Sequence, residues 1–409
     1  MKKITFFGDI MCEPTVLKGA KKGKTYDFNY IFSGVQSLLK GADYRIGNLE
    51  TPLCSKEMGY CDDFADFGCP DTMADALKNA NFDLLSTANN HSFDRKEEGL
   101  VYTIEQLDKR GLAHTGTFLP GTQREEAYYL DIGDMTVAVI CYTYNTNFTA
   151  SGKYVKAEGE YADSVNLLHD QKQGTFLTTM GYGNTWFDKL TKKFIKSEKR
   201  GRIKHFFGAN HAYPKPDDRL EVEKTQPYVD KFTADIQKAK EKADYVIFYP
   251  HIGGQFDPHP GLFTEYIFDK AIEAGADAII ASHAHVVQKA LFRGETLCVY
   301  SLGNFNMDPT SGMIFPATMP AYGLALHLYM EDKKLQKATF SLTVSRKEKG
   351  KLVSYPVHEI YPKLNKKQQL QEKQKKKQQL SQLGKKKKQL KKQLKMLKQQ
   401  KKLLKNKTL

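Results

Sequence analysis

The sequence predicts an α/β fold in which helices cover a largely parallel or mixed β-sheet. Apolar runs of strand length recur along the chain, and a short polar cluster follows each of them. Segments with helical periodicity lie between these runs, and such alternation is typical of a sheet covered by helices. The chain has 409 residues, of which 40% are hydrophobic, so it is long enough to bury a large core.

The expected elements can be placed by their hydrophobic patterns. Strands, with the polar residues that end them, are expected at residues 3–7, 43–47, 82–87, 136–144, 244–255, 277–285 and 297–305. Helices are expected at residues 30–41, 71–80, 96–110, 229–242 and 263–274. Two further alternating segments, 322–330 and 338–346, are joined by the turn EDKK and predict a hairpin, in which His327 is structural.

A stretch of about a hundred residues between the strands at 136–144 and 244–255 does not follow this pattern. Loops of such length usually carry function or extra elements of their own. We interpret residues 145–228 as an insertion that forms a cap beside the functional site. Its histidines, His169, His205 and His211, follow no predicted strand, and we expect them to be non-catalytic.

The basic character of the chain resides in its C-terminal segment. Residues 363–409 contain 19 Lys and a single acidic residue, Glu372, for a net charge of +18, whereas the rest of the chain carries −3. We therefore divide the chain into a domain of residues 1–362 and a Lys/Gln/Leu-rich tail of residues 363–409. Leucines recur at seven-residue intervals in the tail, so it is either a thinly striped basic helix or a disordered extension.

The tail could also bind a polyanion. Eighteen net positive charges in 47 residues would bind an acidic polymer, an anionic membrane surface or RNA, and such binding weakens steeply with salt. This is the sharper of the two hypotheses for the tail, beside that of a solvated extension.

The N-terminal sequence MKKITFFGDI lacks the apolar core of a signal peptide, and no later segment reaches the roughly 20 apolar residues of a membrane span. We therefore expect a cytoplasmic protein, unless the tail holds it at a membrane. The six cysteines fit reduced thiols. Cys54, Cys61 and Cys69 lie near one another but lack the C-x2-C spacing of a structural zinc site.

The polar clusters after the strands contain the residues that can carry chemistry. They are Asp9, Asn48, Glu50, Asn89, Asn90, His91, His251, His283, His285 and Asn304. Because the carboxyl ends of strands in an α/β sheet meet in one crevice, we expect these side chains to share one site. Carboxylate, amide and imidazole ligands without thiolate suit Mn, Fe or Zn. Each residue alone could be a turn or cap residue, but six strand ends would then coincide by chance.

His283 and His285 stand two positions apart just after an apolar run. If strand geometry continues through them, both imidazoles point to the same side and can reach one ion. His259, between two prolines, lies near enough in sequence to His251 to touch a substrate or to be an ordinary loop residue.

The ordered segments GDIM, NLETP, ANNHSFD, H-x-G, H-x-H-V and YSLGNF resemble those of the CapA capsule-synthesis family, also called poly-γ-glutamate biosynthesis proteins. The resemblance covers roughly residues 3–307, and six motifs in order make it specific. It implies a four-layer α-β-β-α sandwich of the metallo-dependent phosphatase type, related to the calcineurin-like metallophosphoesterases.

The resemblance also implies roles for the matching residues. By similarity, one divalent ion would be held by Asp9, Glu50 and His285, and a second by Glu50, Asn90, His251 and His283. His91 would act as a general acid or charge stabiliser, and Asn48, Asn89, His259 and Asn304 are candidate substrate-binding residues, although Asn89 could instead orient its loop. Such ions lower the pKa of water and stabilise developing negative charge.

Two departures weaken this implication. The phosphoesterase motif D-x-H reads Asp9-Ile10-Met11 here, and HIGGQ places Gln255 where the family commonly has an acid. Cys12 or Glu13 could substitute for the lost imidazole, but neither has the matching position. The leading hypothesis is a phosphoesterase-like metal-dependent hydrolase of capsule or poly-γ-glutamate synthesis, acting on a polymer or phosphoester with one or two ions. The alternative is a non-catalytic accessory protein of a polymer synthase with a degenerate metal site.

Overall fold

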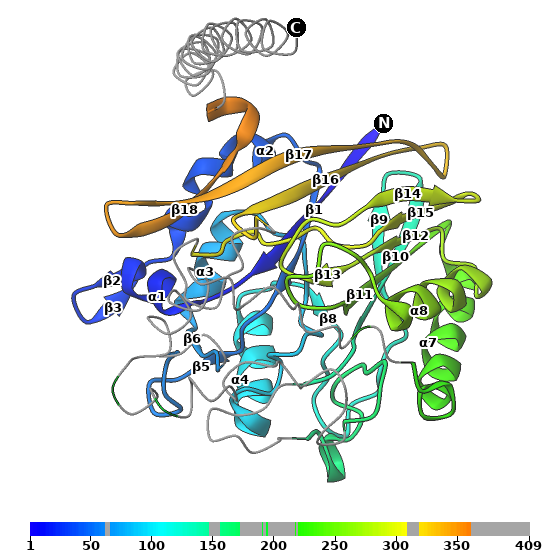
Figure 1. The fold of residues 1–409 in the computed structure, drawn as a ribbon, viewed down its shortest axis with the longest axis horizontal. Coiled ribbons are helices and arrows are strands. Elements are labelled where there is room, and N and C mark those ends of the chain that lie inside the picture. The colour runs from blue at the N-terminus through cyan, green and yellow to red at the C-terminus, as the bar shows by residue number, and fades with distance from the viewer. Residues whose placement is uncertain are drawn as a thin grey trace, which may run out of the picture. The chain divides into compact units, whose positions relative to one another are not determined.

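Two β-sheets form the centre of the fold (Figure 1). The computed structural model describes residues 1–61, 66–146, 156–171, 220–308 and 319–360, with the single residues Leu190, Phe194 and Asp217. Residues 1–356 pack as one unit and residues 357–409 as a second. The first unit contains both sheets and the candidate site. The predicted tail begins at residue 363 and lies outside the described residues.

The first sheet joins four parallel strands to an antiparallel meander. Its strands, in spatial order, are β18 (Lys351–Pro356), β17 (Lys334–Glu348), β16 (Tyr322–Glu331), β1 (Lys2–Ile10), β4 (Tyr44–Leu49), β7 (Leu84–Ser86) and β8 (His114–Thr115). Strands β1, β4, β7 and β8 run parallel to one another, and β16 runs antiparallel to β1. The predicted hairpin is confirmed as β16 and β17, and β18 extends it by a strand that the alternation did not predict.

The second sheet is parallel at its centre and antiparallel at both edges. Its strands, in spatial order, are β14 (Ala290–Arg293), β15 (Thr296–Val299), β12 (Ala278–Ile280), β11 (Tyr245–Ile252), β10 (Met135–Thr143) and β9 (Tyr128–Ile132), while β13 (Ser282–His283) pairs with β11. Short strands β2 (Lys21–Lys22) and β3 (Thr25–Tyr26) pair with each other, as do β5 (Leu53–Cys54) and β6 (Cys69–Pro70).

The helices cover the outer faces of the two sheets (Figure 1). The first sheet is covered by α1 (Pro14–Ala20), the 3-10 helix η1 (Asn29–Val35), α2 (Gln36–Lys40), α3 (Thr72–Asn79) and α4 (Lys96–Lys109). The second is covered by α7 (Val222–Lys242) and α8 (Leu262–Glu273). A short 3-10 helix, η2 (Gly159–Tyr161), lies in the predicted insertion.

Three buried clusters separate the four layers of the sandwich. One lies between the first set of helices and the first sheet, one between the two sheets, and one between the second sheet and helices α7 and α8. Ile4 and Phe6 of β1 face inward and pack with Val139 and Ile247 of the second sheet. Phe7, the next residue of β1, faces outward into the cluster formed with the first set of helices. Because adjacent strand residues point to opposite faces, one strand supplies both layers of core. The predicted α-β-β-α architecture is confirmed.

Two helices differ from the predicted bounds. The segment expected as one helix at residues 30–41 is split into η1 and α2. Helix α7 begins at Val222, seven residues before the predicted start, and continues through Pro227. Proline usually ends a helix because it lacks an N–H and clashes with the preceding turn, so the sequence favoured a later start. Here burial of Thr225 and Val229 on the same helix outweighs that cost.

Most of the predicted insertion lies outside the described residues, including His205 and His211. Its longest described stretch, residues 156–171, forms isolated bridges from Val165 to Thr117, just after β8, and from Leu167 to Thr143 of β10. His169 is buried, with Nδ1 3.0 Å from the Asp170 carbonyl oxygen. None of the helices in the described part of the chain has the length and hydropathy of a membrane span.

Candidate metal centre

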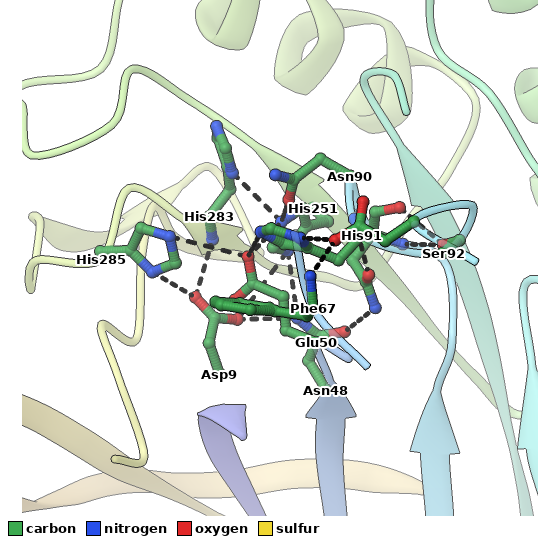
Figure 2. Close-up of polar contacts among 12 residues, drawn as sticks. Asp9, Asn48, Glu50, Phe67, Asn90, His91, Ser92, His251, His283 and His285 are labelled. Atoms are coloured by element: carbon green, nitrogen blue, oxygen red, sulfur yellow. Dashed lines mark hydrogen bonds and ion pairs between the residues drawn. The ribbon is translucent and has the colours of Figure 1, made fainter. Parts of the chain in front are cut away.

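The candidate ligands come together at the carboxyl ends of parallel strands. Asp9 is the penultimate residue of β1, Glu50 follows β4, His251 lies near the end of β11, and His283 ends β13. Figure 2 shows them gathered above the strand ends, with His283 and His285 on one side and His91 on the other. All of these side chains are buried. The structure therefore brings these predicted residues together at the carboxyl ends of the strands, where such residues converge in an α/β sheet.

Two overlapping groups of side chains in the described residues could each hold a cation. Glu50, His283 and His285 form one group, and Asp9, Glu50 and His251 form the other, with the ligand atoms of each group within 4.8 Å of one another. Glu50 belongs to both, as expected for a bridging carboxylate. His285 lies between the two carboxylates, because its Nδ1 is 3.5 Å from Asp9 and its Nε2 is 3.6 Å from Glu50.

The Glu50 carboxylate is the strongest sign that a cation belongs here. It is fully buried, and neither oxygen has a hydrogen-bond partner among the described residues. Burial raises the pKa of Glu50 well above its usual value, and the nearby charge of Asp9 raises it further. An uncompensated buried carboxylate is costly, and a divalent cation removes that cost. The residues present therefore fit a divalent metal.

The pKa of the Asp9 carboxylate is shifted in the opposite direction from that of Glu50. Burial alone would raise its pKa, but the hydrogen bond with His285, the charges of His251 and His285 and the Asn48 amide together lower the pKa to about 2. Asn48 Nδ2 donates to Asp9 Oδ1 at 2.8 Å, and the backbone N–H of His283 donates to Asp9 Oδ2 at 3.2 Å. Asp9 is therefore ionised and oriented, as a metal ligand would need to be.

Two of the imidazoles, those of His251 and His283, are kept neutral by burial. Burial lowers the pKa of His251 to about 3, even though Asp9 acts against it, and His285 and His91 lower it further. Burial and the three neighbouring histidines, His251 first, lower the pKa of His283 well below its usual value. A neutral imidazole offers a lone pair, which is the form that binds a metal.

The two histidines of the H-x-H segment do not reach the site by strand alternation, and that expectation is wrong. Strand β13 ends at His283, where φ is 99°, and His285 has φ of 55°. Both residues lie in a region that side chains other than glycine rarely adopt. The imidazoles are brought together by a turn of strained backbone, which is common where a site fixes its ligands.

Asn90 and His91 approach the cluster from the loop after β7. Asn90 Oδ1 is 2.6 Å from His251 Nε2, which itself is 3.3 Å from Glu50 Oε1. His91 Nε2 is 4.0 Å from the same Glu50 oxygen, and His91 Nδ1 is 2.5 Å from Asp94 Oδ2. Asn90 thus faces the ligand positions, while His91 is held beside them by Asp94.

Three of the four candidate substrate-binding residues make contacts typical of positioning residues. Asn89 Nδ2 donates to Asn48 Oδ1 at 3.1 Å, and Asn48 in turn holds Asp9. Asn304 Oδ1 is 2.8 Å from His285 Nδ1, and its Nδ2 donates to the His285 carbonyl at 2.8 Å. His259 is exposed, and its N–H donates to Asp257 within its own loop. Substrate contact by these four residues stays a prediction.

The structure adds residues that were not among the predicted site residues. Asp94, Ser282 and Tyr144 contact the histidines: Ser282 Oγ is 3.0 Å from His251 Nδ1, and the Tyr144 ring is 4.4 Å from that of His283. Tyr144 directly follows β10, which pairs in parallel with β11, so the strand-end rule could have found it. Phe67, which stacks on His91, had no indication in the sequence.

The departures from the phosphoesterase motif are visible in the structure. Met11 is buried in an apolar cluster with Phe67, Phe256 and Ala284. Glu13 accepts a hydrogen bond from the Asp308 N–H at 2.6 Å, and burial raises its pKa to about 8. Neither Cys12 nor Glu13 belongs to a ligand group among the described residues, so neither replaces the missing imidazole.

The fold and the buried cluster define an α/β sandwich protein with a carboxylate–imidazole site at its strand ends. The chain belongs to the family described as bacterial capsule synthesis protein PGA_cap, whose model matches residues 3–309. The predicted family is thereby confirmed, and with it membership of the metallophosphoesterase-like superfamily.

Known proteins similar to this chain include two from Bacillus. Capsule biosynthesis protein CapA of Bacillus anthracis is 24% identical over 312 residues, covering 75% of this chain and 59% of the relative. PGA biosynthesis protein CapA of Bacillus subtilis is 24% identical over 307 residues, covering 74% of this chain and 63% of the relative. The chain thus spans about three-fifths of the length of these two relatives. The 5'-nucleotidase from Candida albicans SC5314 superposes with a TM-score of 0.39 at 9% identity, covering 84% of this chain and 52% of that structure.

The Glu50 carboxylate, which has no hydrogen-bond partner among the described residues, allows a test of metal binding. We expect Mn²⁺ to raise the unfolding temperature of the wild type, by an amount equivalent to about 2.7 kcal/mol at 100 times the dissociation constant. Glu50→Gln should abolish this response without lowering the stability of the chelator-treated protein, because it removes an uncompensated carboxylate. Glu13→Gln is the matched control, since Glu13 is equally buried but outside both groups. A full Mn²⁺ response in Glu50→Gln would contradict the assignment.

The strained backbone at His283 yields a second test. His283→Gly and His283→Ala both remove the imidazole, but only glycine is at ease at φ of 99°. In chelator-treated protein we expect the glycine variant to be more stable than the alanine variant by about 1 kcal/mol. Denaturant unfolding measures the difference. Equal stabilities would show that the positive φ carries no strain.

Proposed function

We propose that this protein is a metal-dependent hydrolase of the phosphoesterase type that acts in capsule or poly-γ-glutamate synthesis. The observation that carries the proposal is the buried Glu50 carboxylate, which lacks a hydrogen-bond partner among the described residues and is surrounded by Asp9 and three histidines. The role in capsule synthesis is supported by membership of the PGA_cap family and by the names of the two Bacillus relatives.

The residues that would hold the metal are Asp9, Glu50, Asn90, His251, His283 and His285. Divalent ions, when bound, polarise water and stabilise negative charge in the transition state. Asn48 and Asn304 keep Asp9 and His285 in the orientations that ligation requires. Mn, Fe and Zn all suit this set of oxygen and nitrogen donors.

His91 is the residue placed to move a proton. Its Nδ1 is held by Asp94, which leaves Nε2 on the side of Glu50 and the ligand cluster. From that position Nε2 donates a proton to the leaving-group oxygen of a phosphoester. The buried surroundings exclude water and so strengthen this interaction.

A second candidate function follows from Met11 and Gln255. Both stand where the related motifs carry a ligand or an acid, and Met11 belongs to an apolar cluster. A site with fewer ligands could hold a metal for structural reasons, in a non-catalytic accessory protein of a polymer synthase.

Turnover of a generic phosphoester separates the two candidates. With Mn²⁺, His91→Gln should keep its metal and lose roughly 10²- to 10⁴-fold in kcat, because it removes only the proton donor. His283→Ala should lose both metal and turnover. His358→Ala is the control, since His358 is exposed and belongs to neither ligand group, and it should lose neither. Metal bound by the wild type without turnover would favour the accessory role. Absence of metal from the wild type would refute both.

We also propose that the basic tail binds a polyanion. Full-length protein should elute from heparin at a salt concentration that falls sharply when residues 363–409 are deleted, because the remaining chain has a net charge of −3. Sedimentation with vesicles containing phosphatidylserine should show the same dependence on the tail if the polyanion is a membrane. Retention that is insensitive to both salt and deletion would contradict the proposal.

A further inference from the structure

The loop of residues 66–68, which leads into β6, lies beside His91 and is fastened there by Arg95. Arg95 Nε donates to the Gly59 carbonyl at 2.9 Å, and its guanidinium forms an ion pair with Asp66. A Cβ at Gly68 would lie 2.6 Å from Arg95 Nε, so a glycine at this position allows the guanidinium to lie against the loop. The loop is thus anchored at the start of α4, just after the residues that form the site.

Phe67 of this loop contacts both members of the His91–Asp94 pair. Its ring stacks on the His91 imidazole with 4.1 Å between centroids and 21° between planes. Its backbone N–H donates to Asp94 Oδ2 at 2.7 Å, which is the same oxygen that lies 2.5 Å from His91 Nδ1. Phe67 is buried, so the contact is shielded from solvent.

These contacts restrict the imidazole in two independent ways. Asp94 fixes the direction of Nδ1, and the hydrogen bond from Phe67 fixes the Asp94 oxygen that does so. The Phe67 ring covers one face of the imidazole and prevents it from tilting away from Glu50. Together they direct Nε2 toward the ligand cluster, 4.0 Å from Glu50 Oε1.

We propose that Phe67 is a positioning residue for His91, and that the loop held by the Asp66–Arg95 ion pair sets the angle at which His91 donates its proton. The catalytic part of this inference rests on the proposed function. The positioning part rests on geometry alone and has a readout of its own.

The first measurement is spectroscopic and needs no turnover. A short Nδ1–H hydrogen bond to a carboxylate gives a strongly downfield-shifted proton resonance, which is assigned by its loss in His91→Gln. We expect this resonance in the wild type and in Phe67→Tyr, which keeps the ring, and its loss in Phe67→Leu. Phe82→Leu is the matched control, because Phe82 packs on Phe7 and Phe32 in the outer core of the first sheet. It should keep the resonance.

The second measurement uses leaving groups. Phenyl phosphate needs a proton donor, whereas 4-nitrophenyl phosphate has a leaving group that departs without one. With Mn²⁺, Phe67→Leu should lower kcat for phenyl phosphate roughly 10- to 100-fold, with KM little changed and 4-nitrophenyl phosphate far less affected. Phe67→Tyr should restore the rate. A merely structural role would lower both rates together.

The outcomes separate the two claims. Loss of the resonance in Phe67→Leu with no turnover in the wild type would support positioning and refute the proposed function. Any one of three results would overturn the positioning role. They are a resonance that persists in Phe67→Leu, a resonance that is absent from the wild type, and rates that fall equally for both substrates. Should Phe67→Leu fail to fold, Asp66→Asn loosens the same loop from its outer side, and the same two effects are expected at smaller size.

Discussion

The structure depends on one electrostatic constraint, which is a fully buried carboxylate whose oxygens accept no hydrogen bond from the described residues. Glu50 and Asp9 lie at the ends of neighbouring strands, yet their environments differ. Asp9 receives hydrogen bonds from Asn48 and from the His283 backbone, and its pKa is lowered to about 2. Glu50 has neither oxygen bonded among those residues, and burial raises its pKa well above the usual value. A cation would resolve this difference, because it would supply the partner that the Glu50 oxygens lack among the described residues.

The geometry around Glu50 is maintained by residues that do not need to touch a metal. A chain of hydrogen bonds runs from the Asn89 amide to the Asn48 amide and on to the Asp9 carboxylate, and Asn304 holds His285 through both its side-chain oxygen and nitrogen. His283 and His285 are kept at positive φ, which costs roughly 1–3 kcal/mol each. The two sheets and their large inner core supply the stability that maintains this strain. The rigid sandwich and the strained turn are therefore parts of one arrangement.

The sequence predicted the parts of the fold and site that follow from periodicity. Strand ends can be read from hydrophobic runs, so the amino-acid pattern alone was enough to assign Asp9, Glu50 and His251 to one crevice. The backbone at His283 and His285 could not be predicted in this way, because nothing in a local pattern distinguishes a continuing strand from a turn of positive φ. The position of Phe67 beside His91 could not be predicted from the sequence either, because its loop is held by contacts of Arg95 with Gly59 and Asp66, which are distant in sequence. Helix α7 was predicted too short because the local rule for Pro227 was outweighed by packing.

The charges of the ligand set connect the number of ions to the kind of substrate. Asp9 and Glu50 supply two negative charges, while burial keeps His251 and His283 neutral. One divalent ion therefore neutralises the two carboxylates and leaves little attraction for an anion. A second ion would leave an excess of two positive charges in a buried site, which is stable only when an anionic group such as a phosphoester enters to balance it. Because Met11 supplies an apolar side chain where the related motif has an imidazole, the second ion would be the more weakly held. Binding of the second ion and of an anionic substrate should accordingly strengthen each other, since each supplies the charge that the other lacks.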